Sequence, residues 1–271
     1  MATIPAVVEV LADLAEEISA EAARAVTGRS MAKPDVEQRL SALVQRLQSA
    51  LGTRLVSVIL YGSAAAGDWQ EETSDLNVLC VLHQLSPQEL GTCEPIFRWW
   101  KEDGNLPPLL LTAEEVQTST DCFPMEFSDM REHRTVLYGV DVIESLEIDR
   151  SFYRAQVEHE LRAKHIRLRQ KAADILSAPN KLLKLLTDSL STFCVLGRHA
   201  LILSGHEARF KKAEILAALE RAMGRQLEAS SEILALRSTP KQPSPANAGA
   251  LFERYLEEMG SLVRFVDALD K

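Results

Sequence analysis

Apolar residues recur at three- and four-residue spacings in the first part of the chain. Over residues 4–27 they form one stripe, acidic residues largely occupy the opposite face, and Gly28 follows. This pattern is typical of an amphipathic helix. A second stripe begins at Pro34, where proline suits the first helical turn, and ends at Gly52. We therefore expect a helical extension over residues 1–30 and a second helix after a short linker.

After the second helix the pattern changes to short runs of β-branched and apolar residues, which predict strands. A polar, turn-rich segment separates the first two runs. The predicted elements are strands over 55–60, 76–82, 107–111 and, as a candidate, 123–127, with a helix over 86–101. Mixed strands and helices predict an α/β domain with a mixed sheet over residues 31–148.

No strand pattern follows residue 149. Apolar residues instead recur with helical spacing in segments near 149–177, 181–204, 209–225, 226–237 and 248–269. The proline-rich segment 238–249 has the composition of a surface connection. Residues 149–271 are therefore expected to form an all-α helical bundle that follows the α/β domain.

The segment between the first two predicted strands carries the clearest chemistry. The first strand runs into Gly62 and Ser63, and Ser74 and Asp75 precede Asn77 at the start of the second. Glycine lets the backbone approach a ligand closely, and a helix that begins at such a turn offers N–H groups to phosphates. Because side chains alternate along a strand, Asp75 and Asn77 are expected to project to the same side.

This arrangement resembles the nucleotidyltransferase superfamily related to DNA polymerase β, in particular the small bacterial branch that includes the aminoglycoside adenylyltransferases. The family pattern is a strand, Gly-Ser, a further glycine, and Ser-Asp-x-Asp on the next strand. The matching residues are Gly62, Ser63, Gly67, Ser74 and Asp75. The resemblance implies a nucleotidyltransferase-type α/β domain followed by a helical domain. It also implies that Gly62, Ser63 and Ser74 contact a nucleoside triphosphate and that Asp75 holds metal.

The metal-binding carboxylates depart from this pattern. The resemblance implies two magnesium ions held by both acids of Asp-x-Asp and by a third acid on a later strand, but Asn77 occupies the second position. The predicted strand at 107–111 contains no acid, which leaves Glu126 as the candidate third ligand. Alternatively, Glu126 faces solvent at a sheet edge or pairs with Arg131 or Arg134. We expect weak Mg²⁺ binding, if any, because Mg²⁺ depends on carboxylates and phosphates.

Basic residues are concentrated over 154–171, in the first helix of the predicted bundle. The resemblance implies that one edge of this helix meets triphosphate oxygens, with Lys164 and Arg167 as candidate contacts. The alternative is an ordinary solvated face in which Glu158 pairs with Arg162 four residues later. Both interpretations are compatible with the sequence.

Composition narrows the class of protein. With 30 Lys and Arg against 39 Asp and Glu, the net charge of −9 argues against general nucleic-acid binding. The 4 cysteines form no Cys-x-x-Cys pair, so a zinc site is not indicated. A basic leader followed by an apolar segment is absent, as is an uncharged run approaching a membrane span. We expect a cytoplasmic protein without membrane contact.

These observations predict a nucleoside-triphosphate-binding protein descended from enzymes that transfer a nucleotidyl group to a hydroxyl of a small molecule or protein. Asn77 and Asp75 would occupy its catalytic positions, and the incomplete carboxylate set makes it a pseudoenzyme candidate, with chemistry weakened or lost. The alternative is a non-catalytic regulatory or protein-interaction module that uses the same fold as a docking surface.

Overall fold

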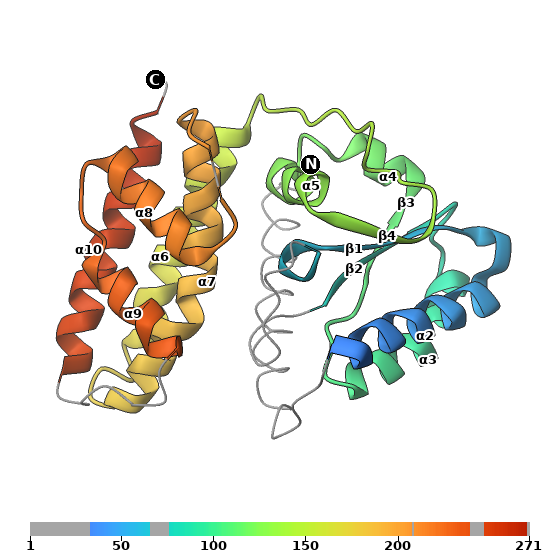
Figure 1. Ribbon diagram of the computed structural model, residues 1–271, viewed down its shortest axis with the longest axis horizontal. Helices are drawn as coiled ribbons and strands as arrows, with labels where there is room; N and C mark the ends of the chain where they lie inside the picture. The colour runs from blue at the N-terminus through green and yellow to red at the C-terminus, as the bar shows by residue number, and fades with distance from the viewer. Residues whose placement is uncertain (1–32, 66–75, 208, 239–246, 270–271) are drawn as a thin grey trace. The chain divides into compact units, whose positions relative to one another are not determined.

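The computed structural model describes residues 33–65, 76–207, 209–238 and 247–269. The chain divides into two compact units, Met1–Ile148 and Asp149–Lys271. In Figure 1 the first unit runs from blue to green and the second from yellow-green to red. The helical extension predicted for residues 1–30 lies outside the described residues.

The first unit is built on a 4-stranded sheet with the strand order β3-β2-β1-β4. The strands are β1 Leu55–Tyr61, β2 Asn77–Leu82, β3 Leu109–Thr112 and β4 Arg134–Gly139. β1 pairs antiparallel with both β2 and β4, whereas β2 and β3 run parallel. The last residue of β1 therefore lies beside the first residues of β2 and β4, at one end of the sheet.

Helices cover both faces of this sheet (Figure 1). They are α2 Lys33–Leu51, α3 Pro87–Glu102, α4 Ala113–Thr118 and α5 Pro124–Glu132. Alternate residues of β1 and β2 enter two separate cores. Val58 and Val78 pack with α2 and α3, while Ile59 and Leu79 pack with α4 and α5. Burial on both faces explains why these strands appear in the sequence as continuous apolar runs.

Helix α3 begins at a capping box next to the 3₁₀ turn η1 (Gly52–Arg54). Ser86 Oγ accepts a hydrogen bond from the N–H of Gln88, and the Glu89 carboxylate accepts one from the N–H of Ser86, both at 3.1 Å. Arg54 Nη1 also donates to Glu89 at 3.0 Å. The carboxylate is almost fully buried, so these donors replace the water it loses.

The strand expected at 123–127 is wrong, because Pro124–Glu132 form helix α5. Pro124 occupies the first helical turn, where its fixed φ is favourable. Phe127 and Met130, three residues apart, both pack against the sheet. A short apolar run fits a strand and a buried helix equally well, so its spacing alone did not distinguish them.

Strand β4 has no counterpart among the predicted elements. It lies at the edge of the sheet, and its residues are half-buried or exposed along their length. The sequence therefore lacks the continuous apolar run that marked the central strands. Gly139 ends β4 with φ +78°, where an added Cβ would lie 2.0 Å from the carbonyl oxygen of Val56. Only glycine permits this approach to β1.

The second unit is helical throughout its described part, in agreement with the expected bundle. Its helices are α6 Tyr153–Ala172, α7 Pro179–Leu203, α8 Lys212–Met223, α9 Glu228–Ser238 and α10 Ala248–Asp267. Helix α7 contacts the other four and buries Leu182, Leu186 and Leu190 at four-residue spacing. None of the described helices combines the length and apolar character that a membrane span requires.

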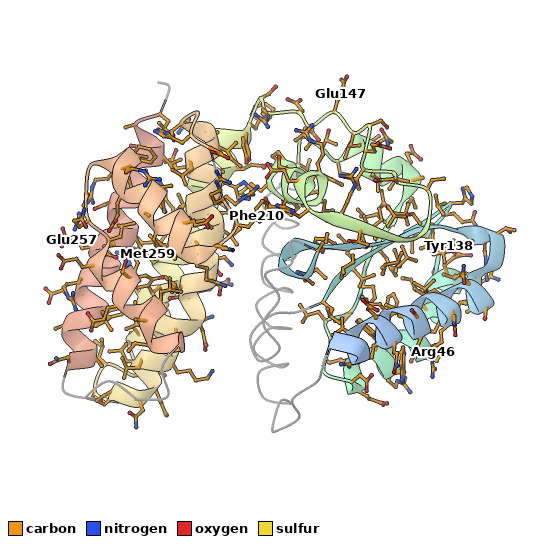
Figure 2. The ribbon with its side chains drawn as sticks, in the orientation of Figure 1. Arg46, Tyr138, Glu147, Phe210, Glu257 and Met259 are labelled. Carbon is orange, nitrogen blue, oxygen red and sulfur yellow. The ribbon has the colours of Figure 1, made fainter. Side chains whose placement is uncertain are left out.

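Helix α10 illustrates how this bundle separates apolar from polar side chains (Figure 2). Met259 is buried, whereas Glu257 lies at the surface and accepts from Arg225 Nη2 at 2.9 Å. The buried Glu258 accepts hydrogen bonds from the backbone N–H groups of Ala229 and Ser230 at 2.7 and 2.9 Å. It thereby caps the first turn of α9 from a neighbouring helix.

Candidate functional site

The turn after β1 has the geometry that the Gly-Ser motif predicts. β1 ends at Tyr61, and Gly62–Ala64 form the 3₁₀ turn η2. Gly62 has φ +77°, a left-handed conformation that L side chains rarely adopt. A Cβ placed on Gly62 would also lie 3.0 Å from Nδ2 of Asn77. Backbone conformation and neighbouring side chain thus both favour glycine at this position.

Strand register places three side chains in a row at this end of the sheet. Tyr61 pairs with Asn77 of β2 on one side and with Arg134 of β4 on the other. Directly opposite residues in a sheet project from the same face. Leu76 and Val78, on either side of Asn77, enter the core against α2 and α3, so Asn77 projects from the face covered by α4 and α5. We call Asn77, Tyr61 and Arg134 the strand-end row.

Glu126 lies on α5, not on a strand, and is exposed. Its carboxylate still acts on the strand-end row: the pKa of Tyr61 is raised above its usual value, first by burial and then by the charge of Glu126. Arg134 donates from Nε to both carboxylate oxygens of Asp141, at 2.9 and 2.8 Å. Glu126 was expected on an edge strand. It lies instead on helix α5, which covers the same face of the sheet.

Several predicted site residues fall outside what the structure describes. These are Ser74, Asp75 and the side chain of Ser63, so their predicted roles stay predictions. Strand β3 consists of Leu109, Leu110, Leu111 and Thr112 and carries no acid. Among the described residues, no group of three His, Cys, Asp or Glu side chains is placed to hold a metal ion. A neutral amide at Asn77 and an acid-free β3 do not fit the magnesium pair that the resemblance implies.

Lys164 and Arg167 lie on α6, in the helical unit, and both are half-buried. Part of the basic charge on α6 is neutralised locally. Glu158 accepts from Arg154 Nη1 and from Arg162 Nε, each at 2.7 Å. The ordinary helix pair considered from the sequence is therefore present, and a role for Lys164 and Arg167 in phosphate binding stays a prediction.

Sequence reasoning did not identify Tyr61 and Arg134 as neighbours of the site. Tyr61 was discernible, since it directly precedes Gly62 at the end of an apolar strand. Arg134 was not, because its place depends on the pairing of β1 with the edge strand β4. Such long-range pairing leaves no local pattern around Arg134.

Comparisons with known proteins bear on the fold. No protein-family model matches the chain, and no curated protein matches it. Among solved structures that match, one is spectinomycin adenyltransferase AAD(9) from Enterococcus faecialis with ATP and spectinomycin. The two chains are 15% identical, with a TM-score of 0.53 over 83% of this chain and 99% of the other. This chain therefore has the nucleotidyltransferase fold, an α/β unit with a mixed sheet followed by a helical bundle.

Proposed function

We propose that this protein binds a nucleoside triphosphate at the Gly62 turn and that its capacity for nucleotidyl transfer is weakened or lost. The observation that carries the proposal is the position of the Asn77 side chain next to Gly62. The turn keeps the glycine that close approach of a phosphate requires, while the neighbouring strand presents an amide where the family pattern has a carboxylate. The similar AAD(9) structure contains ATP and supports the choice of ligand.

In this proposal the phosphates contact the backbone at Gly62 and the hydroxyl groups of Ser63 and Ser74. Hydroxyl and backbone N–H groups donate hydrogen bonds to phosphate oxygens, and such charge-assisted bonds are stronger than neutral ones. Lys164 and Arg167 are the candidate cations from the helical unit. The cytoplasmic location expected from the sequence stays part of this proposal.

Loss of a carboxylate at position 77 bears directly on metal binding. Two unit charges about 4 Å apart at an effective dielectric of about 20 interact by about 4 kcal/mol, and a divalent ion roughly doubles this attraction. Asn77 supplies none of it. Asp75 and Glu126 remain as candidate ligands, so we propose that Mg²⁺ binds weakly at most.

The proposed ancestry is among enzymes that transfer a nucleotidyl group to a hydroxyl of a small molecule or protein. Spectinomycin accompanies ATP in the AAD(9) structure, which supports a small-molecule acceptor as the first class to test. The charge of −9 weighs against a nucleic-acid backbone as a general partner.

Calorimetric titration of ATP into wild type and Gly62→Val tests the proposal. We expect wild type to bind and the variant, whose side chain would collide with Asn77 and occupy the turn, to lose binding while keeping its far-ultraviolet circular dichroism. Equal affinity of the two proteins would rule out the Gly62 turn as the site.

The acid-free β3 also supports a second candidate, a non-catalytic regulatory or protein-interaction module on the same fold. Thermal melting with and without ATP distinguishes the two candidate functions. A nucleotide-binding protein melts at a higher temperature when ATP is added, because ligand binds only the folded state. An interaction module without a nucleotide site shows no such shift.

A further inference from the structure

The side-chain amide of Asn77 reaches the Gly62 turn. Among the described residues its terminal Nδ2 lies 3.0 Å from the position of a Cβ on Gly62, and Cγ lies at 3.9 Å. A carboxylate has only acceptor oxygens when ionised, whereas an amide carries two N–H donors. Phosphate oxygens are acceptors, so an N–H can contact them directly and a carboxylate needs a cation in between.

The other two residues of the strand-end row, Tyr61 and Arg134, also carry hydrogen-bond donors. Tyr61 carries a phenol, whose O–H can also donate. Arg134 is a cation, and Asp141 balances its charge through the contacts to Nε. The row contains an amide, a phenol and a guanidinium, and β3 adds no acid. The carboxylate that acts on the row, Glu126, is exposed on α5.

We infer that this protein binds the nucleoside triphosphate in its metal-free form, with hydrogen-bond donors at the Gly62 turn taking the place of magnesium. The inference rests on the proposed function, since it assumes that the triphosphate lies at this turn. It goes further by naming the form of the ligand: the tetra-anion rather than its magnesium complex.

In this inference the residue at position 77 determines how magnesium changes the affinity for ATP. With asparagine, excess magnesium does not tighten ATP binding, and it removes free triphosphate from solution. With aspartate, the added carboxylate repels bare phosphate oxygens, and a divalent cation between them relieves the repulsion. Asn77→Asp is therefore expected to reverse the sign of the magnesium effect.

Calorimetric titration with ATP, in EDTA and in excess magnesium chloride, tests this inference on the full chain. Wild type, Asn77→Asp and Gln84→Glu are compared. Gln84 is exposed and follows the other end of β2, so its substitution makes the same amide-to-carboxylate change away from the Gly62 turn. Melting curves of each variant confirm that it is folded before titration.

Wild type and Gln84→Glu should bind ATP in EDTA at least as tightly as in magnesium. Asn77→Asp should bind about tenfold or more weakly in EDTA than wild type, the range expected when a hydrogen bond to a charged group is lost, and recover with magnesium. Wild-type binding that appears only with magnesium would overturn this inference and leave the proposed function standing. Failure of wild type to bind ATP in both buffers would overturn the proposed function itself.

Discussion

Nδ2 of Asn77 lies 3.0 Å from the position that a Cβ would occupy on Gly62. Two residues of one sequence motif, separated in the chain by a polar segment, are thus neighbours at the end of adjacent antiparallel strands. The contact has two consequences. Together with the φ of +77° at Gly62, it favours glycine at position 62, and it puts an amide at the turn where the family pattern has a metal-binding carboxylate.

Gly62→Ala should abolish ATP binding and reduce stability. Alanine at positive φ costs about 1–2 kcal/mol, and the new methyl group enters the space beside Asn77. Gly52→Ala is the matched control, because Gly52 has φ +55° with nothing within 4 Å of its Cβ position. It lies in η1, before the first residue of β1 and therefore beyond the opposite end of that strand. Urea unfolding and calorimetry should show comparable destabilisation of both variants, with ATP affinity retained in Gly52→Ala.

Lys164→Met and Arg167→Met should each weaken ATP binding about tenfold or more if these side chains contact phosphate, which is the loss expected for one hydrogen bond to a charged group. Lys184→Met on α7 serves as control, since Lys184 is exposed and pairs with Asp188 at 3.1 Å. Affinities equal to wild type in both α6 variants would assign the basic residues of α6 to an ordinary helix surface.

Glu89 should make the stability of the α/β unit depend on acid pH. Hydrogen bonding from Ser86, followed by Arg54, lowers the pKa of this carboxyl to about 2. A depressed folded-state pKa contributes stability that is present above the unfolded pKa of about 4.5 and lost as pH falls toward about 2. Urea midpoints measured between pH 6 and 2.5 should therefore fall more steeply in wild type than in Glu89→Gln.

The control for this pH series is Glu94→Gln. Glu94 pairs with Arg98 on the exposed surface of α3, where ion pairs contribute little. Glu94→Gln should show the same change of urea midpoint with pH as wild type. Equal changes in wild type and Glu89→Gln would show that Glu89 does not cause the dependence of stability on pH.

Leu190→Ala should destabilise the helical unit by about 2–5 kcal/mol, because the truncation leaves a cavity at a fully buried position. Val195→Ala, on the same helix but 46% exposed, should change stability by about 0.5 kcal/mol or less. Chemical unfolding followed by circular dichroism measures the free energy of unfolding of both variants. Similar losses in both variants would contradict the assignment of Leu190 to the core of the bundle.

The strand-turn-strand from β1 to β2 was predictable because both strands are buried on two faces and appear as continuous apolar runs. Gly62 was predictable for a related reason, since a strand that ends in Gly-Ser requires a sharp turn. Strand β4 was not predictable, because an edge strand with exposed residues such as Val136 leaves a weak pattern. Arg134 and the helical position of Glu126 depend on packing between distant segments, which local spacing does not encode.

The most direct measurement for the central claim is pyrophosphate release from nucleoside triphosphates, with label transfer to hydroxyl acceptors, across magnesium and manganese concentrations. Nucleotidyl transfer relies on metal ions to align the triphosphate and neutralise charge on the leaving pyrophosphate. We predict little or no turnover by wild type. Asn77→Asp should bind magnesium more tightly yet remain a poor enzyme, because β3 offers no carboxylate. Robust wild-type turnover that disappears in Asp75→Ala would contradict the account.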